Sequence, residues 1–176
     1  GLIQVERSRL GDATARDRLD AIGRRISALG AIHEQFYAAE NLQRIDCLGQ
    51  LSKLALRSAE RQERSGIRIE VAGEPIRCDL DTALTIGMIA DELIDNCCRH
   101  AFPDGRPGTV RVSLDRIAGG IRLTVEDDGV GMGRERPDGI GGSIVEALAG
   151  QIGASVATAT GPAGTVVRIS IPGRDP

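Results

Sequence analysis

Residues 82–102, TALTIGMIADELIDNCCRHAF, form the stretch that decides the fold. At about 100° per residue, four of its apolar side chains fall on one narrow stripe of a helix: Ile86, Ala90, Leu93 and Cys97. Asp81 stands directly before the stretch and is a suitable N-cap. We therefore expect a helix over residues 82–99 whose apolar stripe packs against a sheet.

Three polar side chains of the same stretch, Glu92, Asn96 and Arg99, lie together along one edge of the stripe. Side chains at such an edge can line a cleft. A carboxylate and an amide oxygen one turn apart suit a hydrated Mg²⁺, which keeps several waters and takes few protein oxygens. A solvated helix flank is the alternative interpretation of the same residues.

Residues 125–132, VEDDGVGM, place acidic side chains at the end of a predicted strand and follow them with two glycines. The carboxylate of Asp127 can accept a hydrogen bond from an exocyclic amine such as that of adenine. Gly129 and Gly131 allow the backbone to approach a flat ring or a phosphate closely. In isolation the motif is also typical of a glycine-rich turn.

Residues 138–145, DGIGGSIV, open a predicted helix with glycines, among them Gly139 and Gly141. Free amides at a helix N-terminus bind phosphate oxygens, aided by the partial positive charge there. No lysine follows the glycines as a P-loop requires, and no preceding βαβ unit supports a dinucleotide-binding fingerprint.

Together these motifs resemble the ATP-binding domain of the histidine-kinase, gyrase, heat-shock-chaperone and MutL ATPase superfamily. Residues 91–102 are similar to its N box, in the "ELxxNxxxHAF" form of one bacterial histidine-kinase subfamily. Residues 127–131 resemble its G1 box, residues 139–141 its G2 box, and residues 164–165 the turn before its last strand. Residues 25–37 are similar to the second helix of that subfamily's dimerisation and phosphoacceptor domain.

The resemblance implies a Bergerat-type two-layer α/β sandwich, with a mixed sheet and helices on one face, that binds ATP and Mg²⁺. It implies a two-component sensor histidine kinase, which passes the γ-phosphate to a histidine and then to an aspartate of a response-regulator receiver domain. Glu92 and Asn96 are then the catalytic residues, and Asn96 is the Mg²⁺ ligand. The implied nucleotide contacts are Asn96, Arg99, His100, Asp127, Gly129, Gly131, Gly139, Gly141 and Thr165.

Alternating apolar residues and turn residues predict the remaining elements. They are a hairpin of residues 67–71 and 76–80, a hairpin of residues 110–116 and 121–127, a helix over 142–152, and a hairpin of residues 154–160 and 165–171. Helices and strands alternate without a regular βαβ repeat, which independently favours a mixed sheet with helices on one face.

A heptad seam runs through residues 13–39 at Leu19, Ile22, Ile26, Leu29, His33 and Phe36. With the apolar residues before it, the seam predicts an antiparallel helical hairpin that pairs with a second copy as a homodimer. We expect residues 1–42 to be part of a dimerisation and phosphoacceptor hairpin, and residues 43–176 to be the catalytic ATP-binding domain. A helix over residues 46–64, capped by Asp46, opens that domain.

The chain has two histidines, His33 and His100. A histidine in a seam is usually a packing residue, although Glu34 beside His33 is the kind of acid that activates an imidazole. The subfamily's acceptor lies on the first hairpin helix, which by resemblance precedes Gly1. We therefore expect this chain to bind ATP without phosphorylating itself.

Composition narrows the function classes further. In 176 residues, 41% are hydrophobic and 27% charged, the balance of a globular protein in water. A formal charge of −3 with mixed signs offers no basic face to nucleic acid. No apolar run approaches the roughly 20 residues of a membrane span, so we expect a cytoplasmic location. The four cysteines have no metal-ligand spacing and are expected to be reduced packing residues.

Two other functions stay open. An anti-sigma serine kinase shares the ATP-binding motifs but lacks a helical hairpin, so the heptad seam argues against it. A phosphotransfer or scaffold protein could keep the fold and bind a response regulator without ATP. Gly142, where the family usually has leucine, and the short stretch of residues 132–138 leave room for that function.

Overall fold

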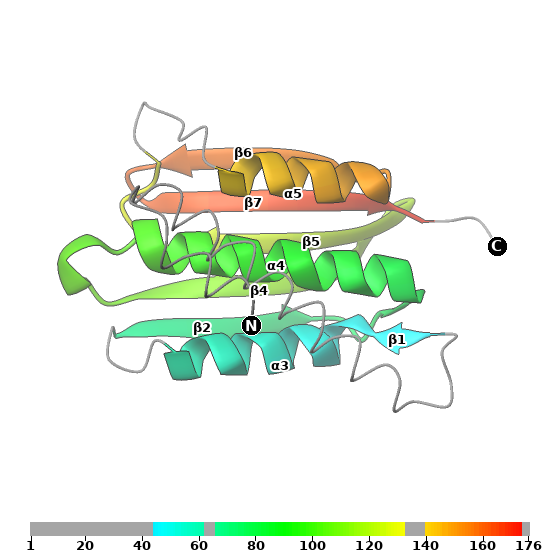
Figure 1. Cartoon of the computed structure of the whole chain (residues 1–176), viewed down its shortest axis with the longest axis horizontal. Coiled ribbons are helices and arrows are strands. Elements are labelled where there is room, and N and C mark those ends of the chain that lie inside the picture. The colour runs from blue at the N-terminus through cyan, green and yellow to red at the C-terminus, as the bar shows by residue number, and fades with distance from the viewer. Residues whose placement is uncertain (1–43, 62–65, 133–139, 174–176) are drawn as a thin grey trace, which may run out of the picture. The chain divides into compact units, whose positions relative to one another are not determined.

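The computed structural model describes residues 44–61, 66–132 and 140–173, all of which belong to one compact unit, Gln43–Pro176 (Figure 1). The helical hairpin expected over residues 1–42, with His33 in its seam, lies outside the described residues. So does Gly139. None of the described helices is long and apolar enough to cross a membrane.

A five-stranded mixed sheet forms one layer of this unit, in the order β2-β4-β5-β7-β6. β2 and β4 are parallel, whereas the other neighbours are antiparallel. Two of the hairpins predicted from alternation, that of residues 110–116 and 121–127 and that of residues 154–160 and 165–171, are confirmed as β4–β5 and β6–β7. The strands are β2 (Ile67–Gly73), β4 (Gly108–Ile117), β5 (Gly120–Asp127), β6 (Ser155–Gly161) and β7 (Gly164–Pro172).

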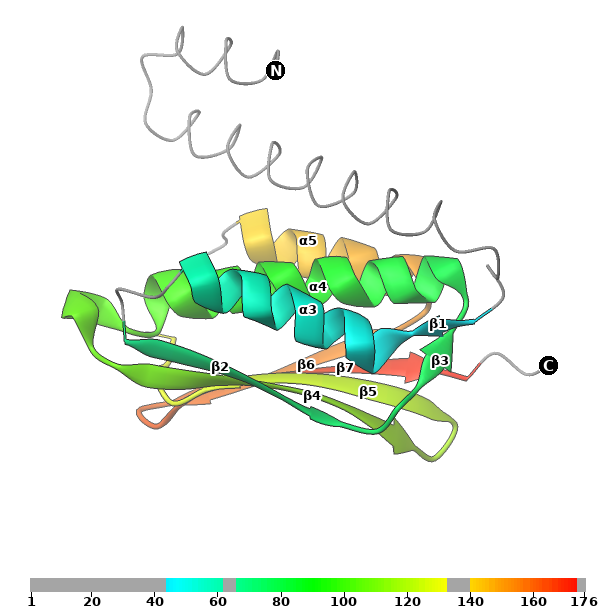
Figure 2. The same cartoon turned by 90° about the horizontal axis from the view of Figure 1, so that it is seen from below.

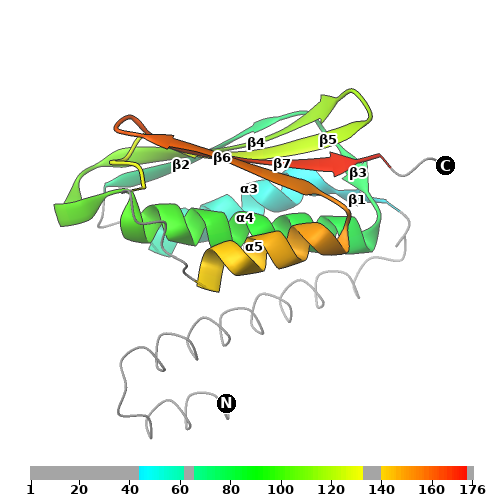
Figure 3. The ribbon, with the colours of Figure 1, turned by 90° about the horizontal axis from the view of Figure 1, so that it is seen from above.

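Three helices cover one face of the sheet and form the second layer (Figure 2). They are α3 (Cys47–Arg61), α4 (Leu80–His100) and α5 (Ile140–Gln151), followed in the case of α4 by a short 3₁₀ helix, Pro103–Gly105. The view from the opposite side shows the same helices on that face only (Figure 3). The predicted two-layer α/β sandwich with a mixed sheet is confirmed.

The core lies between the layers, with α4 at its centre. Three members of the predicted stripe, Ile86, Ala90 and Leu93, are buried, and Cys97 is half-buried. Alternate side chains of the strands meet the helices, since the burial patterns of β4, β5 and β7 follow the two-residue period. This packing holds the C-terminal end of α4 beside the end of β5 and the start of β7.

The predicted hairpin of residues 67–71 and 76–80 is wrong. β2 pairs with β4, which follows α4 along the chain, and β3 (Arg77–Cys78) pairs with β1 (Ile45–Asp46) in a separate two-stranded sheet. The turn does not return the chain to β2, because the amide of Glu74 donates to the carbonyl of Leu114 on β4 (2.8 Å). Ile76 is buried, so the chain crosses from the sheet to the helix layer here.

The start of α4 also differs from the expectation. Asp79, not Asp81, is the N-cap: its Oδ1 accepts from the amide of Thr82 (2.9 Å) and its Oδ2 from the Thr82 hydroxyl (2.9 Å). Both aspartates are suitable by residue type, but Asp79 has the extended backbone that a cap requires. Asp46 caps α3 as predicted, since its carboxylate accepts from the amide of Gly49 (3.1 Å).

Candidate nucleotide-binding site

Two of the motifs named from sequence, on α4 and after β5, meet at one end of the sandwich, where α5 also begins (Figure 1). Asp127 is the last residue of β5 and pairs in register with Thr165 of β7. The thiol of Cys97, near the end of α4, donates to Oδ2 of Asp127 (3.5 Å). Helix α4 and strand β5 are thus in direct contact through side chains.

Asp127 is a buried carboxylate, 5% exposed, whose two oxygens have unequal partners. Oδ1 accepts from the backbone amides of Gly129 (3.0 Å) and Thr165 (3.3 Å). Among the described residues, Oδ2 accepts only from the Cys97 thiol, which is a weak donor. Burial, followed by the neighbouring carboxylate, raises the pKa of Cys97, so the thiol keeps its proton. One oxygen of Asp127 therefore remains available to a stronger donor.

The loop after β5 is held by close backbone contacts that require its glycines. A Cβ on Gly129 would lie 2.3 Å from the carbonyl oxygen of Ala101, which also accepts from the amide of Val130 (3.0 Å). Gly131 has a φ of +73°, and a Cβ there would lie 2.0 Å from the carbonyl oxygen of Gly161. The loop is consequently fixed between the end of α4 and the β6–β7 turn.

Two further residues of the site were missed by sequence reasoning. The hydroxyl of Thr160 accepts from the amide of Met132 (2.7 Å) and lies 3.1 Å from the hydroxyl of Thr165. Asp128, next to Asp127, is used structurally: its Oδ1 accepts from the amide of Thr109 (2.7 Å). A threonine directly across the hairpin from Thr165 was the one available signal for Thr160.

The polar edge of α4 is only partly free to meet a ligand. Glu92 and Asn96 are half-buried, and Asn96 directly precedes the cysteine that contacts Asp127. Arg99 is exposed and forms an ion pair with Asp95 one turn earlier (2.8 Å). His100 is exposed and is the last residue of α4. Arg99 therefore has to leave Asp95, or share its guanidinium, in order to contact an anion.

The G2 glycines are described only in part. Gly141 is the second residue of α5, which begins at Ile140, so the backbone amides of a helix N-terminus occur where the sequence predicted them. Among the described residues there is no cluster of three or more histidine, cysteine, aspartate or glutamate side chains suited to a metal ion. A magnesium ion here would rely on few protein ligands, as Mg²⁺ bound with a nucleotide commonly does.

Comparisons with known proteins agree with this geometry. Residues 81–175 match the family "Histidine kinase-, DNA gyrase B-, and HSP90-like ATPase", and residues 1–60 match a histidine kinase family, HisKA_2. The chain is 29% identical to blue-light-activated histidine kinase 2 of Erythrobacter litoralis, over 97% of this chain and 51% of that protein. It is 30% identical to the sensor histidine kinase PdtaS of Mycobacterium tuberculosis, over 84% of this chain and 30% of that protein.

Solved structures give the same result. The histidine kinase domain of the Erythrobacter litoralis EL346 blue-light-activated histidine kinase has a TM-score of 0.78 at 28% identity, over 97% of this chain and 82% of that one. The histidine kinase AdeS of Acinetobacter baumannii has a TM-score of 0.67 at 18% identity, over 90% and 80%, which supports the fold alone. The chain spans about half, or less, of the length of the curated relatives it matches.

Proposed function

The chain belongs to the histidine kinase-, DNA gyrase B- and HSP90-like ATPase family, and from this premise we propose that its residues 43–176 bind ATP with Mg²⁺. We propose further that the domain is the catalytic region of a two-component sensor histidine kinase. In that role it transfers the γ-phosphate of ATP to a histidine, from which the phosphate passes to a receiver-domain aspartate.

The observation that carries the proposal is the unequal use of the Asp127 carboxylate. Two backbone amides fix Oδ1 in a buried position, while within the described part of the chain Oδ2 has only a thiol as a partner. The exocyclic amine of adenine is a donor strong enough to take this position. A hydrogen bond to a buried charged acceptor contributes about 1.5–3 kcal/mol, which is enough to select a base.

The phosphate end is assigned to α4 and to the start of α5. Asn96 supplies an amide oxygen to Mg²⁺, and Glu92 one turn earlier is the catalytic carboxylate. The ion, when bound, offsets the negative charge of the phosphates. The amides at the start of α5, with Gly139 and Gly141, take phosphate oxygens, Arg99 adds positive charge beside them, and His100 is a further contact. Gly129, Gly131 and Thr165 shape the pocket around the base.

The partners follow from the same assignment. The acceptor histidine and the receiver domain of a response regulator are the protein substrates, and a second copy of the chain is the dimer partner. We assign His100, the last residue of α4, to the phosphate side of the site and not to the role of acceptor, and by resemblance the family's acceptor lies on the hairpin helix and not in this domain. Within this chain we therefore propose that ATP binds without self-phosphorylation.

Calorimetric titration of the 176-residue chain with ATP tests the proposal directly. We expect one nucleotide per chain, with an affinity that rises when Mg²⁺ is added. Acid-labile phosphate should not accumulate on the chain in the same mixture, either in the wild type or in His33→Gln. A chain that binds neither ATP nor ADP at any Mg²⁺ concentration would refute the proposal and favour an ATP-independent scaffold.

A further inference from the structure

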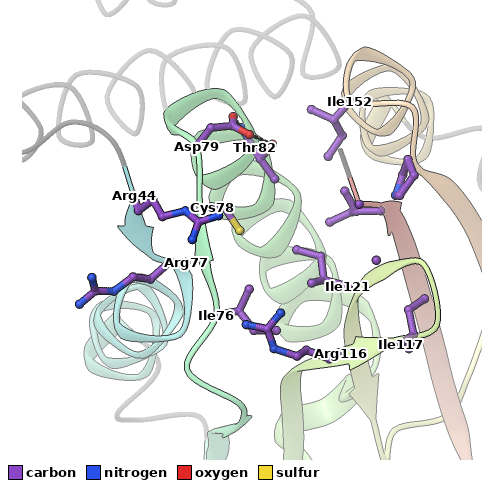
Figure 4. Close-up of a pocket in the computed structure, with 14 residues that line it drawn as sticks. Arg44, Ile76, Arg77, Cys78, Asp79, Thr82, Arg116, Ile117, Ile121 and Ile152 are labelled. Carbon is purple, nitrogen blue, oxygen red and sulfur yellow. Dashed lines mark hydrogen bonds between the residues drawn. The ribbon is translucent and has the colours of Figure 1, made fainter. Parts of the chain in front are cut away.

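A second concave site lies at the other end of α4 from Asp127. It is a pocket of about 510 Å³ between β3, the start of α4, the β4–β5 turn and the end of β7 (Figure 4). Its floor is apolar and includes Ile121 and Ile171, whereas Arg44, Arg116 and Cys78 stand along its wall. The nucleotide motifs do not account for this site.

Cys78 combines access with a basic environment. It lines the pocket and is 8% exposed. Arg44 and Arg116 lie near enough to stabilise a negative charge on that sulfur. Arg116 is itself held by an ion pair with Glu74 (3.6 Å). Cys78 is therefore a thiol that lines a pocket together with arginines and one carboxylate, that of Asp79.

Cys47 lies next to Cys78 because of the β1–β3 pairing. Cys78 pairs with Ile45, and Cys47 follows two residues later, its amide donating to the carbonyl of Ile76 (2.9 Å). Cys47, the first residue of α3, therefore lies at the end of the β1–β3 pair, diagonally offset from Cys78. Cys47 is 1% exposed, so a reagent in the pocket reacts with Cys47 only after it has reacted with Cys78.

The two thiols differ in how readily they lose a proton. Interaction with the Cys47 side chain lowers the pKa of Cys78, and Arg116 and Arg44 add to the effect against burial and the Asp79 carboxylate, while the Cys47 thiol donates to the carbonyl of Ile45 (3.6 Å). The interaction between the two cysteines, followed by burial, raises the pKa of Cys47. Access assigns the two roles: Cys78, which lines the pocket, is the nucleophile, and Cys47, which is 1% exposed, is its neighbour, and the directions of the two pKa shifts agree with this.

We propose that Cys78 is a modification site for hydroperoxides and that Cys47 is its resolving cysteine. The Cys78 thiolate attacks one oxygen of hydrogen peroxide, the O–O bond breaks, hydroxide leaves, and a sulfenic acid forms. The sulfur of Cys47 then attacks the sulfur of Cys78. This forms a disulfide, and the sulfenic oxygen leaves as water with the proton of Cys47. Overall, two thiols are oxidised by two electrons and one peroxide is reduced to two waters.

The other cysteines are poor competitors. The Cys97 thiol donates a hydrogen bond to Asp127 and is kept neutral by burial. Burial and the carboxylate of Asp95 raise the pKa of Cys98 to about 11. At neutral pH both present much less thiolate than Cys78, so oxidation should begin at the pocket.

The disulfide would join the first residue of α3 to β3, directly before the cap of α4. α4 has 21 residues and is about 30 Å long, and the nucleotide motifs lie at its far end. Oxidation should therefore leave nucleotide affinity within about twofold of that of the reduced chain. Oxidation of Cys78 can consequently be tested independently of the function proposed above.

The test is peptide mapping of the reduced wild-type chain after brief exposure to a small excess of hydrogen peroxide. Trypsin releases Ile45–Lys53, with one cysteine, and Cys78–Arg99, with three. We expect these two peptides to be joined, and fragmentation to place the link at Cys78. A link at Cys97 or Cys98, a stable sulfenic acid at Cys78 without a link, or oxidation of Cys98 before Cys78 would overturn the proposal.

Variants define the two roles. In Cys47→Ala, dimedone should trap a sulfenic acid at Cys78, whereas Cys98→Ala should still form the cross-link. Arg116→Gln should slow alkylation of Cys78 about two- to fivefold, because it removes a nearby positive charge. Arg111→Gln, an exposed arginine on the same strand that pairs with Glu70, is the matched control and should leave the rate unchanged. Equal rates in the two arginine variants would contradict the electrostatic argument.

Discussion

The two ends of α4 form sites by different means. At the Asp127 end, most of the contacts are made by the backbone. Backbone amides fix a carboxylate, and glycines allow the loop after β5 to contact Ala101 and Gly161. At the Cys78 end, side chains from separated segments gather around an apolar floor. The first end is acidic at its centre, whereas the second is basic.

This difference explains why one end was visible in the sequence and the other was not. Backbone contacts that tolerate only glycine produce short motifs with fixed spacing. Side chains that converge from β1, β3 and β4 leave no local pattern, because Arg44, Cys78 and Arg116 are far apart in the chain. A test of either end should therefore leave the other unchanged.

The largest expected effect is that of Asp127→Asn on nucleotide binding. Asparagine can keep the amide contacts of Oδ1, but it replaces Oδ2 with a donor that opposes the adenine amine. We expect a loss of about 1.5–3 kcal/mol, or on the order of 10- to 100-fold in ATP affinity by calorimetry. Asp128→Asn is the control, since the carboxylate of Asp128 already accepts a hydrogen bond from the amide of Thr109. Similar losses in both variants would show that local folding, not base recognition, was affected.

Gly129→Ala should disturb the packing of the loop after β5 against the end of α4, beside the candidate nucleotide site. The added methyl would lie 2.3 Å from a backbone oxygen that cannot yield without moving the end of α4. We expect the free energy of unfolding to fall by about 1–3 kcal/mol in urea denaturation, with weaker ATP binding. Gly150→Ala is the matched control, because no atom lies within 4 Å of the new methyl. That variant should gain about 0.5–1 kcal/mol, since alanine favours the helix.

Asn96→Ala should separate metal binding from base binding. The amide oxygen is lost, but Asp127 and its contacts are untouched, so ADP without Mg²⁺ should bind as in the wild type. The gain in ATP affinity on adding Mg²⁺ should shrink by roughly tenfold. Parallel titrations of both nucleotides with and without the ion measure this. If ADP binding without Mg²⁺ falls as much as Mg-ATP binding, Asn96 is not the metal ligand.

The sequence predicted the parts of the fold that depend on local pattern. The stripe on α4, the β4–β5 and β6–β7 hairpins and the cap at Asp46 follow from helical period, alternation and residue type. The pairing of β2 was missed because its partner lies beyond a 21-residue helix, and a parallel neighbour leaves no hairpin signal.

Within the candidate site, the sequence named Asp127 and the two residues whose amides hold its Oδ1, Gly129 and Thr165, but not the contacts of Cys97 and Thr160. Cys97 was expected only as an apolar stripe residue, yet its thiol meets the carboxylate. Thr160 lies on the opposite strand of a hairpin, and its role depends on register. Such contacts arise from tertiary packing, which a motif does not encode. The nucleotide contacts themselves remain predictions.

The smallest effect should come from Asp79→Ala, which touches only the Cys78 end. It removes the cap that satisfies the amide of Thr82, which should cost about 1 kcal/mol of unfolding free energy. It also removes a carboxylate that raises the pKa of Cys78, so more thiolate is present and alkylation of Cys78 should become faster. ATP affinity should not change, because the variant lies at the opposite end of α4. Asp81→Ala is the control: it keeps the cap and loses only a first-turn charge, worth about 0.3–1 kcal/mol, without faster alkylation. Slower alkylation in Asp79→Ala, or a change in ATP affinity, would mean that the two ends of α4 do not act separately.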